Sequence, residues 1–497
     1  MERLHPDRLA ALPADVARPR YDRAALLPGI VHLGVGAFQR AHLAAVNEAA
    51  LHATGDLRWG VVGVSLRQPD TRDALAPQAG LYTLALRDAA ADGSPREALQ
   101  VIGHLLEVMV APDDPGAVLE RIAHPHTRIV SLTVTEKGYH HEPATGRLRA
   151  DDADIAHDLA HPAAPRTALG FTVHALQRRR ERSLAAVTLL SCDNLPANGD
   201  TLRGLVLAFA AQVDPALHDW IAAECAFPNA MVDRIVPRTT DDDRARIAQR
   251  LQLHDAWPVV GEPFLDWALE DRFASGRPAW QRGGARFVER AEPFERLKLR
   301  MVNGSHSALA WLGAVAGWPT VDRAVGQPAL HRYLDTLLRD EIAPTLRGLR
   351  EFDLADYRAR LLERFANPAL QHRTQQIAMD GSQKIAQRLL GTVRDRLAAH
   401  ASVDRLGLAV AGWLHYLRGV DETGTRYDIQ DPLAAELVAL RERADATGSV
   451  HDGVVLIMSA LPVFGELAHA PRFVAAVARH ALSLRQRGVL ATLDSLP

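Results

Sequence analysis

The stretch GIVHLGVGAFQRAH, residues 29–42, decides the fold of the N-terminal part of this chain. It starts with an apolar run of strand length, which leads into a turn containing Gly34 and Gly36 and then into a helix-forming segment. A strand, a glycine turn and a helix make up the phosphate-binding opening of dinucleotide-binding folds. Gly34 allows the tight turn, and Gly36 lets the backbone approach a pyrophosphate at the helix N-terminus. Gln39 replaces the third glycine of the G-x-G-x-x-G pattern, so the turn alone is a weak signal.

The composition is that of a globular protein with more than one domain. A chain of 497 residues exceeds one ordinary core. Its net charge of −3 gives no support for a nucleic-acid or membrane partner, and no charge-free apolar stretch approaches the length of about 18 residues that a membrane span needs. The N-terminus has no signal-peptide core, and Cys192 and Cys225 cannot make a disulfide framework. We therefore expect a cytoplasmic protein.

Further apolar runs predict a parallel sheet. The run at 59–66 is typical of a strand buried on both faces, and other strands are expected at 81–86, 99–103, 129–133 and 186–190, with helices between several of them. From about residue 290 the strand pattern fades and long amphipathic segments dominate. The fold class we expect is an α/β Rossmann-type domain with a parallel-rich sheet over 1–288, followed by a mostly α-helical domain over 289–497.

Polar clusters follow several of these strands. Thr135 and Glu136 lie in one cluster and Asn194 in another, and ligands of open α/β sheets bind beyond the carboxyl ends of the strands. Asp70 is the first acid after the strand at 59–66, where such folds bind the adenosine ribose. Asp70 is also consistent with a solvated loop, and the nearby Arg67 leaves the choice between NAD and NADP open.

A second stretch, KLRMVNGSH at 298–306, places polar groups on an apolar helix that we expect over 294–316. At about 100° per residue, Asn303 would lie about 140° from Lys298, and His306 about 80° from it. One interpretation is that these side chains cap neighbouring loops. The other is that they line a cleft, because such groups are rarely buried without partners.

The second interpretation has a chemical purpose if a nicotinamide lies over the strand ends. Oxidation of a secondary alcohol needs a base for the hydroxyl proton and donors for the developing alkoxide. Lys298 suits the base role if burial lowers the pKa of its amine. Asn303 and Asn194 can donate amide protons to the reacting oxygen, and His306 can hold a neighbouring hydroxyl. The sequence offers no convincing zinc ligand set, so we expect no metal.

At this point the motifs resemble those of the polyol-specific long-chain dehydrogenases, the mannitol dehydrogenase family. The resemblance covers nearly the whole chain. It rests on VHLGVGAFQRAH (31–42), SLTVTEKGY (131–139), SCDNLPANG (191–199), FPNAMVDRIVP (227–237), KLRMVNGSHS (298–307) and MDGSQK (379–384). Members of this family use NAD or NADP without a metal and have a Rossmann-type domain followed by a mostly helical one.

The resemblance implies a role for each matching position. Lys298 would be the general acid/base, Asn194 and Asn303 would polarise the reacting oxygen, and Glu295 would pass the proton to solvent. His306 and Asp233 would orient the substrate, and Lys384 would bind its distal end. Asp70 falls on the acid that favours NAD over NADP. The cofactor-binding residues would be Gly34, Gly36, Ala37, Phe38, Asp70, Thr135 and Glu136.

The segment HRTQQIAMDGSQK, residues 372–384, resembles fructuronate reductases more than mannitol dehydrogenases, which carry an arginine at the place of Gln376. An arginine with a nearby lysine suits a terminal carboxylate, so we add Arg373 and His372 to the substrate-binding residues. The sequences at 216–221 and 255–264 lean toward the mannitol enzymes instead. The leading expectation is NAD-dependent interconversion of D-fructuronate and D-mannonate.

Other readings remain open. The runner-up is mannitol 2-dehydrogenase activity or a related polyol or altronate dehydrogenase. A reading from another class is a nucleotide-binding sensor without catalysis, which would have no need of Lys298. In each case the partner is a small molecule, a sugar acid or polyol for the enzymes. We expect a monomer or a weak homo-oligomer.

Overall fold

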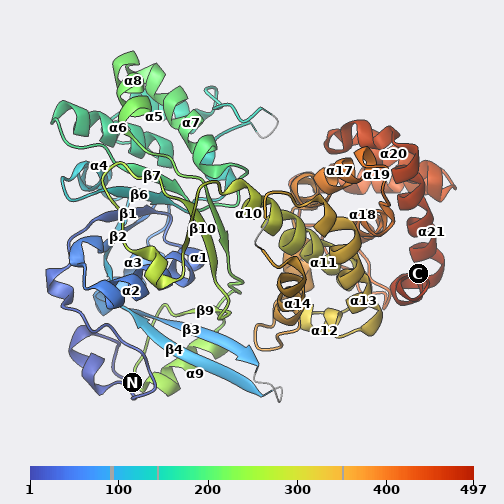
Figure 1. The fold of residues 1–497 in the computed structure, drawn as a ribbon, viewed down its shortest axis with the longest axis horizontal. Helices are drawn as coiled ribbons and strands as arrows, with labels where there is room; N and C mark the ends of the chain where they lie inside the picture. The colour runs from blue at the N-terminus through green and yellow to red at the C-terminus, as the bar shows by residue number, and fades with distance from the viewer. Residues whose placement is uncertain (90–93, 143–144, 350–351, 497) are drawn as a thin grey trace. The chain divides into compact units, whose positions relative to one another are not determined.

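The computed structural model describes residues 1–89, 94–142, 145–349 and 352–496 (Figure 1). The chain forms two compact units, an N-terminal unit over Met1–Glu295 and a C-terminal unit over Arg296–Pro497. Compactness alone defines this division. The functional boundary predicted at 288/289 stays a prediction.

A five-stranded parallel sheet forms the centre of the N-terminal unit. Its strands run in the order β5 (Leu105–Val110), β2 (Val61–Ser65), β1 (Ile30–Leu33), β6 (Ile129–Leu132) and β7 (Thr188–Ser191), and every neighbouring pair is parallel. All four residues of β1 are buried, as expected for a central strand covered on both faces. The predicted Rossmann-type domain with a parallel-rich sheet is confirmed.

Helices cover both faces of this sheet because its strand residues alternate between two cores. Val31 and Leu33 belong to a core that includes α4 (Pro115–Ala123), α6 (Ala168–Glu181) and α7 (Asn198–Val213), whereas Ile30 packs with α2 (Leu43–Thr54). Figure 1 shows α4, α6 and α7 on one side of the strands and α2 on the other. None of the helices in the described residues is long and apolar enough to cross a membrane.

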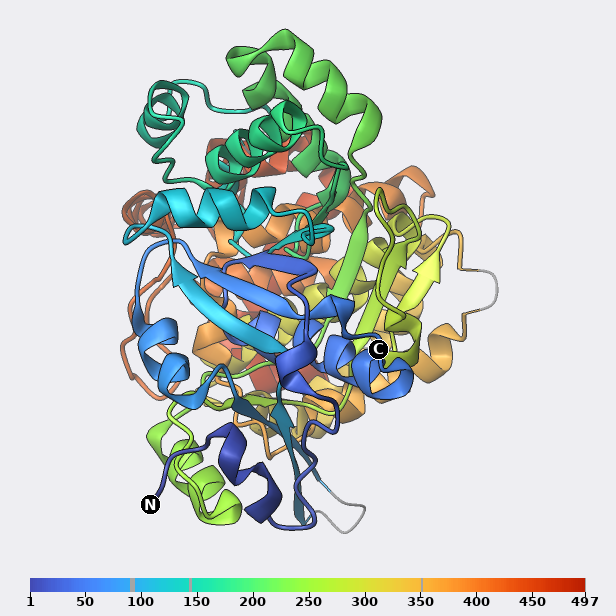
Figure 2. The ribbon, with the colours of Figure 1, turned by 90° about the vertical axis from the view of Figure 1, so that its left-hand side faces the viewer.

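Two of the predicted strands do not belong to the parallel sheet. β3 (Tyr82–Ala89) and β4 (Pro95–Ile102) form an antiparallel hairpin, and β9 (Val259–Gly261) pairs with β3 in a separate three-stranded sheet. Figure 2 shows this hairpin extending away from the parallel strands. The assignment of 81–86 and 99–103 to the parallel sheet was therefore wrong, because an apolar run indicates burial but not strand direction. The strand that completes the parallel edge, β5, was not predicted.

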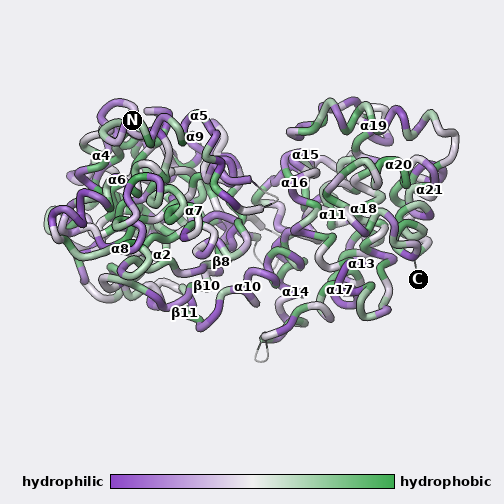
Figure 3. Tube along the Cα trace, turned by 90° about the horizontal axis from the view of Figure 1, so that it is seen from above, coloured by the Kyte–Doolittle hydropathy of each residue, from purple (hydrophilic) through white to green (hydrophobic). Residues whose placement is uncertain are grey.

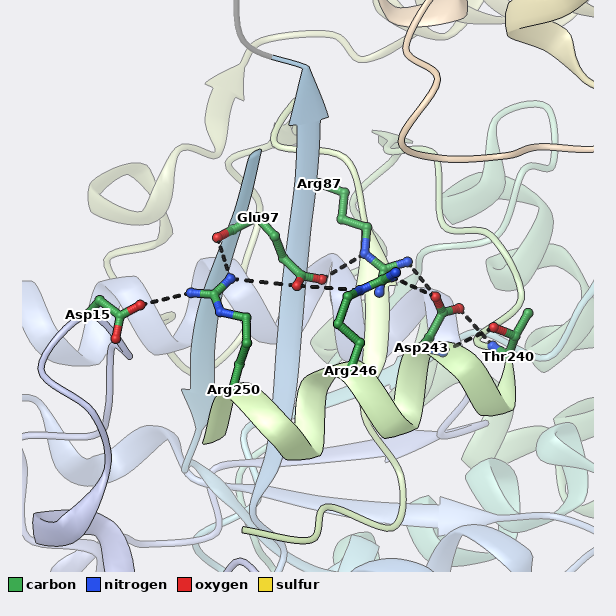
Figure 4. Close-up of polar contacts among 7 residues, drawn as sticks. All are labelled: Asp15, Arg87, Glu97, Thr240, Asp243, Arg246 and Arg250. Atoms are coloured by element: carbon green, nitrogen blue, oxygen red, sulfur yellow. Dashed lines mark hydrogen bonds and ion pairs between the residues drawn. The ribbon is translucent and has the colours of Figure 1, made fainter. Parts of the chain in front are cut away.

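An ionic network fastens the hairpin to α9 (Asp241–Leu251). Arg87 of β3 donates to Glu97 of β4 at 2.7 Å and to Asp243 of α9 at 2.6 Å. Arg246 and Arg250 of α9 extend this network on the same face of the hairpin (Figure 4). Beneath these charges, apolar side chains of α9 join the hairpin in one core. The small sheet is thus held by a helix rather than by the parallel sheet alone.

A third sheet has the order β11 (Arg286–Val288), β10 (Asp266–Glu270) and β8 (Ala230–Asp233). β8 lies within the polar cluster 227–235 of the sequence, and it runs antiparallel to β10. The strand brings Asp233 to its carboxyl end.

The described residues of the C-terminal unit are mostly helical and include no strand beyond isolated bridges, which confirms the predicted mostly α-helical domain. Its core helix, α11 (Ser305–Val315), is buried at every position and packs against α18 (Asp404–Tyr416). The ring centroids of Trp311 on α11 and Trp413 on α18 are 6.1 Å apart. Figure 3 shows both helices as mainly hydrophobic. The other helices are α12 (Val321–Val325), α13 (Pro328–Thr336), α14 (Leu354–Phe365), α15 (Thr374–Ala378), α16 (Gly381–Ile385), α17 (Gly391–Ala398), α19 (Ala434–Ala446), α20 (Val450–Ala460) and α21 (Pro471–Asp494).

Candidate active site

The glycine turn lies at the point where the strand order of the parallel sheet reverses. Gly34 follows β1 with φ +94°, and a Cβ there would lie 2.2 Å from the carbonyl oxygen of Thr133, which follows β6. Gly36 caps α1 (Ala37–Ala41), and a Cβ at this position would meet nothing within 4 Å. The backbone of the turn therefore packs tightly against Thr133 at Gly34 and has open space beside it at Gly36. This arrangement fits a pyrophosphate approaching the helix start, where Ala37 and Phe38 form the first turn.

Asp70 lies beyond the end of the adjacent strand. β2 ends at Ser65, and Asp70 is the exposed first residue of α3 (Asp70–Leu75). Arg67, also exposed, lies in the segment between them. Asp70 is the first carboxylate after this strand, and its expected contact with the ribose hydroxyls stays a prediction.

Two loops at the ends of β6 and β7 are joined by a buried carboxylate. Asp193 accepts hydrogen bonds from the backbone N–H groups of Val134 and Thr135, both at 3.0 Å, and from the hydroxyl of Tyr139 at 2.8 Å. Burial raises the pKa of Asp193, and these hydrogen bonds oppose the shift. Thr135 has φ +63°, so the loop that carries Thr135 and Glu136 adopts a strained backbone held by this carboxylate.

The loop that contains Asn194 is fixed at two further points. Asn194 itself is exposed, while Asn198 donates to the carbonyl oxygens of Ser191 and Asp193, both at 3.1 Å, and exchanges hydrogen bonds with Ala230 of β8.

Two other predicted site residues lie near these loops. Glu295 of α10 (Glu292–Leu297) accepts from the backbone N–H of Ala197 at 2.9 Å, so it reaches the loop that carries Asn194. Asp233 is 5% exposed and ends β8, the strand to which Asn198 ties this loop. The N-terminal unit thus brings its predicted site residues to the carboxyl ends of its strands.

In the C-terminal unit the segment with Lys298 is not an α-helix. A π-helix, η7 (Lys298–Gly304), joins α10 to α11, so the expected single α-helix over 294–316 was wrong in its pitch. A π-helix closes i→i+5 hydrogen bonds, which is the spacing from Lys298 to Asn303, and these two residues therefore lie on the same side. The angle of about 140° expected for an α-helix does not apply. Lys298 is 6% exposed.

The buried ring of His306 lies beside the half-buried ring of His372. The centroid of the His306 ring is 4.8 Å from that of Phe365, on which it stacks, and 5.3 Å from that of His372, and within the described part of the chain neither His306 Nε2 nor His372 Nδ1 has a hydrogen-bond partner. Burial, with the neighbouring positive charges, holds the pKa of His306 well below its usual range, and burial lowers the pKa of His372 to about 4. Both rings are neutral at pH 7. Besides burial, the cations Arg388, Arg364 and Lys384 lower the pKa of His306, as does His372 when that ring is protonated.

Lys384 and Arg373, the two cations predicted to bind the distal end of the substrate, differ in their exposure and contacts. The ammonium of Lys384 donates to the carbonyl oxygens of Met379 at 2.5 Å and Ile377 at 3.3 Å, beside α15. Arg373 is exposed immediately before α15. The ring of His372 meets that of His306, and Lys384 is among the cations that lower the pKa of His306.

One set of potential metal ligands occurs among the described residues. Ligand atoms of His140, Asp152 and Asp154 lie within 4.8 Å of one another. Arg149 lies 3.9 Å from Asp152 and Arg166 lies 4.0 Å from Asp154, and Asp152 also caps α5 (Ala153–Ala160). Both carboxylates thus have an arginine nearby, and the expectation of a site without a metal stays a prediction.

Comparison with known proteins decides the family. The family model for the mannitol dehydrogenase Rossmann domain matches residues 28–282, and the model for the mannitol dehydrogenase C-terminal domain matches residues 290–485. The chain belongs to the mannitol dehydrogenase family.

Relatives in this family differ in their substrates. D-mannonate oxidoreductase of Escherichia coli is 43% identical over 95% of this chain and 96% of its own length. Mannitol 2-dehydrogenase of Phaeosphaeria nodorum is 38% identical over 96% of this chain and 83% of its own length. The structure of Pseudomonas fluorescens mannitol 2-dehydrogenase in a ternary complex with NAD and D-mannitol matches with a TM-score of 0.90 and 38% identity, covering 99% of each chain.

Two structurally important residues of this mannitol dehydrogenase family member were not predicted from the sequence. Asp193 and Asn198 flank the predicted Asn194 and hold its loop to β6 and β8. A signal was available for Asp193, because a carboxylate directly after a buried strand needs donors. An Asn-Gly pair such as Asn198-Gly199 is common in ordinary turns, and only the tertiary contact with Ala230 distinguishes this one.

Proposed function

We propose that this chain is an NAD-dependent oxidoreductase that reduces the ketone of a sugar acid, with D-fructuronate as substrate and D-mannonate as product. Family membership supports the coarser statement, that it is an oxidoreductase acting on the CH–OH groups of polyols or sugar acids. The observation that carries the finer one is the charge around His306. Arg388, Arg364 and Lys384, whose positive charges lower the pKa of His306, are all cations at pH 7. A carboxylate suits such surroundings.

The N-terminal unit fits NAD. The open backbone at Gly36 suits a pyrophosphate, and the exposed Asp70 suits an unphosphorylated ribose, since a carboxylate would repel a 2′-phosphate. The relative from Pseudomonas fluorescens with a TM-score of 0.90 was solved with NAD. When bound, the nicotinamide supplies or accepts the hydride. The residues of this chain handle the proton and the oxygen.

In the direction of alcohol oxidation, Lys298 as a neutral amine takes the hydroxyl proton, and Glu295 passes it onward to solvent. Asn194 and Asn303 donate amide hydrogens to the reacting oxygen, where negative charge develops; donors of this kind contribute roughly 3 kcal/mol each in other enzymes. The neutral ring of His306 exchanges a hydrogen bond with a neighbouring hydroxyl and, with Asp233, orients the substrate. Ketone reduction reverses these transfers.

The second candidate is interconversion of D-mannitol and D-fructose. Arg373, the arginine expected to bind a carboxylate, is exposed, whereas His306 is buried. The neutral rings of His306 and His372 each have a ring nitrogen that can bind a hydroxyl of an uncharged polyol. The exposure of Arg373 therefore favours the polyol over the sugar acid.

The test is the ratio of kcat/KM for D-fructuronate to that for D-fructose, measured by NADH oxidation. A charge-assisted hydrogen bond contributes about 1.5–3 kcal/mol, so we expect a preference for the uronate of about 10- to 100-fold. Equal or better turnover of fructose and mannitol would reject the sugar acid.

Two variants locate the group that binds the carboxylate. Lys384→Met should raise KM for the uronate at least about tenfold and change KM for fructose less. Arg373→Ala should do the same if Arg373 contributes, and an equal effect on both substrates would assign it a structural role. Arg394→Met, at an exposed position of α17, is the matched control.

A further inference from the structure

Three π-helices occur among the described residues of the C-terminal unit, and η7 contacts both of the others, η8 (Leu337–Ile342) and η10 (Ala386–Leu390). η10 lies between α16 and α17, two residues after Lys384, and it packs against η7, which carries Lys298 and Asn303. The wide pitch is marked at its end, where the N–H of Gly391 reaches back to the carbonyl oxygen of Ala386. π-Helices are rare and are frequently found at functional sites. η8 carries no predicted site residue, whereas η7 carries Lys298 and Asn303 and η10 follows Lys384, so the contact between η7 and η10 is the one that bears on the site.

The two segments meet backbone to backbone at Gly304. A Cβ on Gly304 would lie 2.7 Å from the carbonyl oxygen of Arg388, a separation that no ordinary side chain tolerates. The obstacle is main chain, which cannot rotate away as a flexible side chain can. Only glycine at this position lets η7 and η10 approach so closely.

An arginine from each of these two π-helices also makes a contact across the junction. Arg388 of η10 donates to the hydroxyl of Ser307 at 2.9 Å and to the backbone carbonyl of Asn303 at 3.5 Å. In return, Arg300 of η7 pairs with Asp395 of α17 at 2.5 Å. Ser307 is fully buried, so its hydrogen bond with Arg388 is shielded from solvent. The packing is thus clamped from both directions around Asn303.

This clamp has a consequence for the chemistry. If η7 relaxed to an α-helix, each residue would turn by about 100°, and Asn303 would move to about 140° from Lys298. In the π-helix the two residues are one hydrogen-bonded turn apart and share a side. The wide turn is therefore what aligns the proposed base with the proposed oxyanion donor.

We infer that the contact between η7 and η10 holds this wide turn open, and that Arg388 and Gly304 are positioning residues for Lys298 and Asn303. Arg388 acts through two contacts. One is with the backbone of Asn303 in η7, and the other is with Ser307 in the first turn of α11. The inference rests on the proposed function for the roles of Lys298 and Asn303. The conformation of the turn can be measured without it.

The first experiment compares two glycine variants. Gly304→Ala places a methyl group against the Arg388 carbonyl, whereas Gly391→Ala at the end of η10 meets only the Arg300 side chain at 3.5 Å, an ordinary contact. We expect Gly304→Ala to lower kcat about 100-fold with KM and Kd for NADH unchanged, because a misplacement of about 1 Å costs that much. The kcat of Gly391→Ala should stay within about threefold of the wild-type kcat. Hydrogen exchange should show faster exchange of amides 299–305 in Gly304→Ala only.

The second experiment keeps the inference testable if Gly304→Ala does not fold. Arg388→Met should lower kcat without changing Kd for NADH. Arg388→Lys can still donate to Ser307 or Asn303, so its kcat should be at least about tenfold higher than that of Arg388→Met. Adding Ser307→Ala to Arg388→Met should have little further effect, because the two side chains act as a pair. Arg394→Met is again the matched control.

The outcomes separate the two hypotheses. If the wild type reduces no ketose or ketouronate, the proposed function fails, and the inference is judged on hydrogen exchange alone. Unchanged kcat and unchanged exchange in both Gly304→Ala and Arg388→Met would overturn the positioning role. Loss of NADH binding in step with kcat would also overturn it, since that pattern indicates general unfolding.

Discussion

Glu48 offers the sharpest prediction about the stability of the N-terminal unit. Its carboxylate lies fully buried in α2 and accepts hydrogen bonds from Tyr21 at 2.8 Å, from His104 Nδ1 at 2.8 Å and from the N–H of Gly103 at 3.0 Å. Burial alone would raise the pKa of Glu48, but hydrogen bonds from His104 and His52 outweigh it and hold the pKa at about 2. The ionised form is therefore favoured by the fold itself.

The magnitude follows from the pKa shift. The ordinary pKa is 4.5 and the folded value about 2, so at 1.36 kcal/mol per unit the ionised carboxylate stabilises the fold by about 3 kcal/mol. Because the folded pKa is depressed, this contribution is present above pH 4.5 and is lost as the pH falls toward 2. Glu48→Gln should therefore lower the free energy of unfolding by about 3 kcal/mol at pH 7, and the difference from the wild type should shrink by about 1 kcal/mol at pH 4.

Urea unfolding at pH 7 and pH 4 measures both quantities, with an unchanged m-value as the check that the same surface is exposed. Glu107→Gln is the matched control, because Glu107 pairs with Arg121 on the surface and its side chain is 47% exposed. Such a pair contributes at most about 1 kcal/mol. If Glu48→Gln unfolds at the same urea concentration as Glu107→Gln at pH 7, the buried carboxylate does not stabilise the fold and the reasoning fails.

Three further predictions concern the remaining parts of the chain. Lys298→Ala should lower kcat by about 10²- to 10⁴-fold and leave Kd for NADH unchanged in a fluorescence titration; retained turnover would place the base elsewhere. Asp70→Ser should reduce the preference for NADH over NADPH, measured as a ratio of kcat/KM, and an unchanged ratio would make Asp70 a solvated loop residue. Glu97→Gln should destabilise the chain by about 1–3 kcal/mol in thermal unfolding, because the side chain is only 12% exposed and pairs with Arg87, whereas Asp242→Asn on the exposed side of α9 should not.

Much of the fold could be predicted because burial leaves a strong mark on sequence. The apolar runs that form β1, β2, β6 and β7 were found, and so was the glycine turn between β1 and α1. The pairing of β3 with β4 was not, because burial says nothing about strand direction. β5 escaped because only Gly103 and His104 separate it from β4, too short a break to register as the end of a strand.

The candidate site could be predicted where chemistry is carried by a residue type at a strand end or on an apolar helix. It could not be predicted where a residue acts through a distant backbone. Asn198 ties its loop to Ala230 across 32 positions of sequence, and Arg388 reaches the backbone of Asn303 across 85. The pitch of η7 is also invisible, since apolar positions in the sequence suggest a helix but do not say which hydrogen bonds it closes.

The distal end of the substrate site shows why spacing along the chain is a poor guide to specificity. Arg373 and Lys384 are neighbours in the motif, but the chain turns at Asp380, where φ is +54°, and a helical count across this break has no meaning. Of the cations that lower the pKa of His306, Lys384 lies in this segment, whereas Arg364 lies on α14 and Arg388 on η10. Whether the substrate carries a carboxylate is therefore a question about α14 and η10 as much as about the 372–384 segment. A member of this family that differs at Arg364 would be the natural comparison for the uronate-to-fructose ratio.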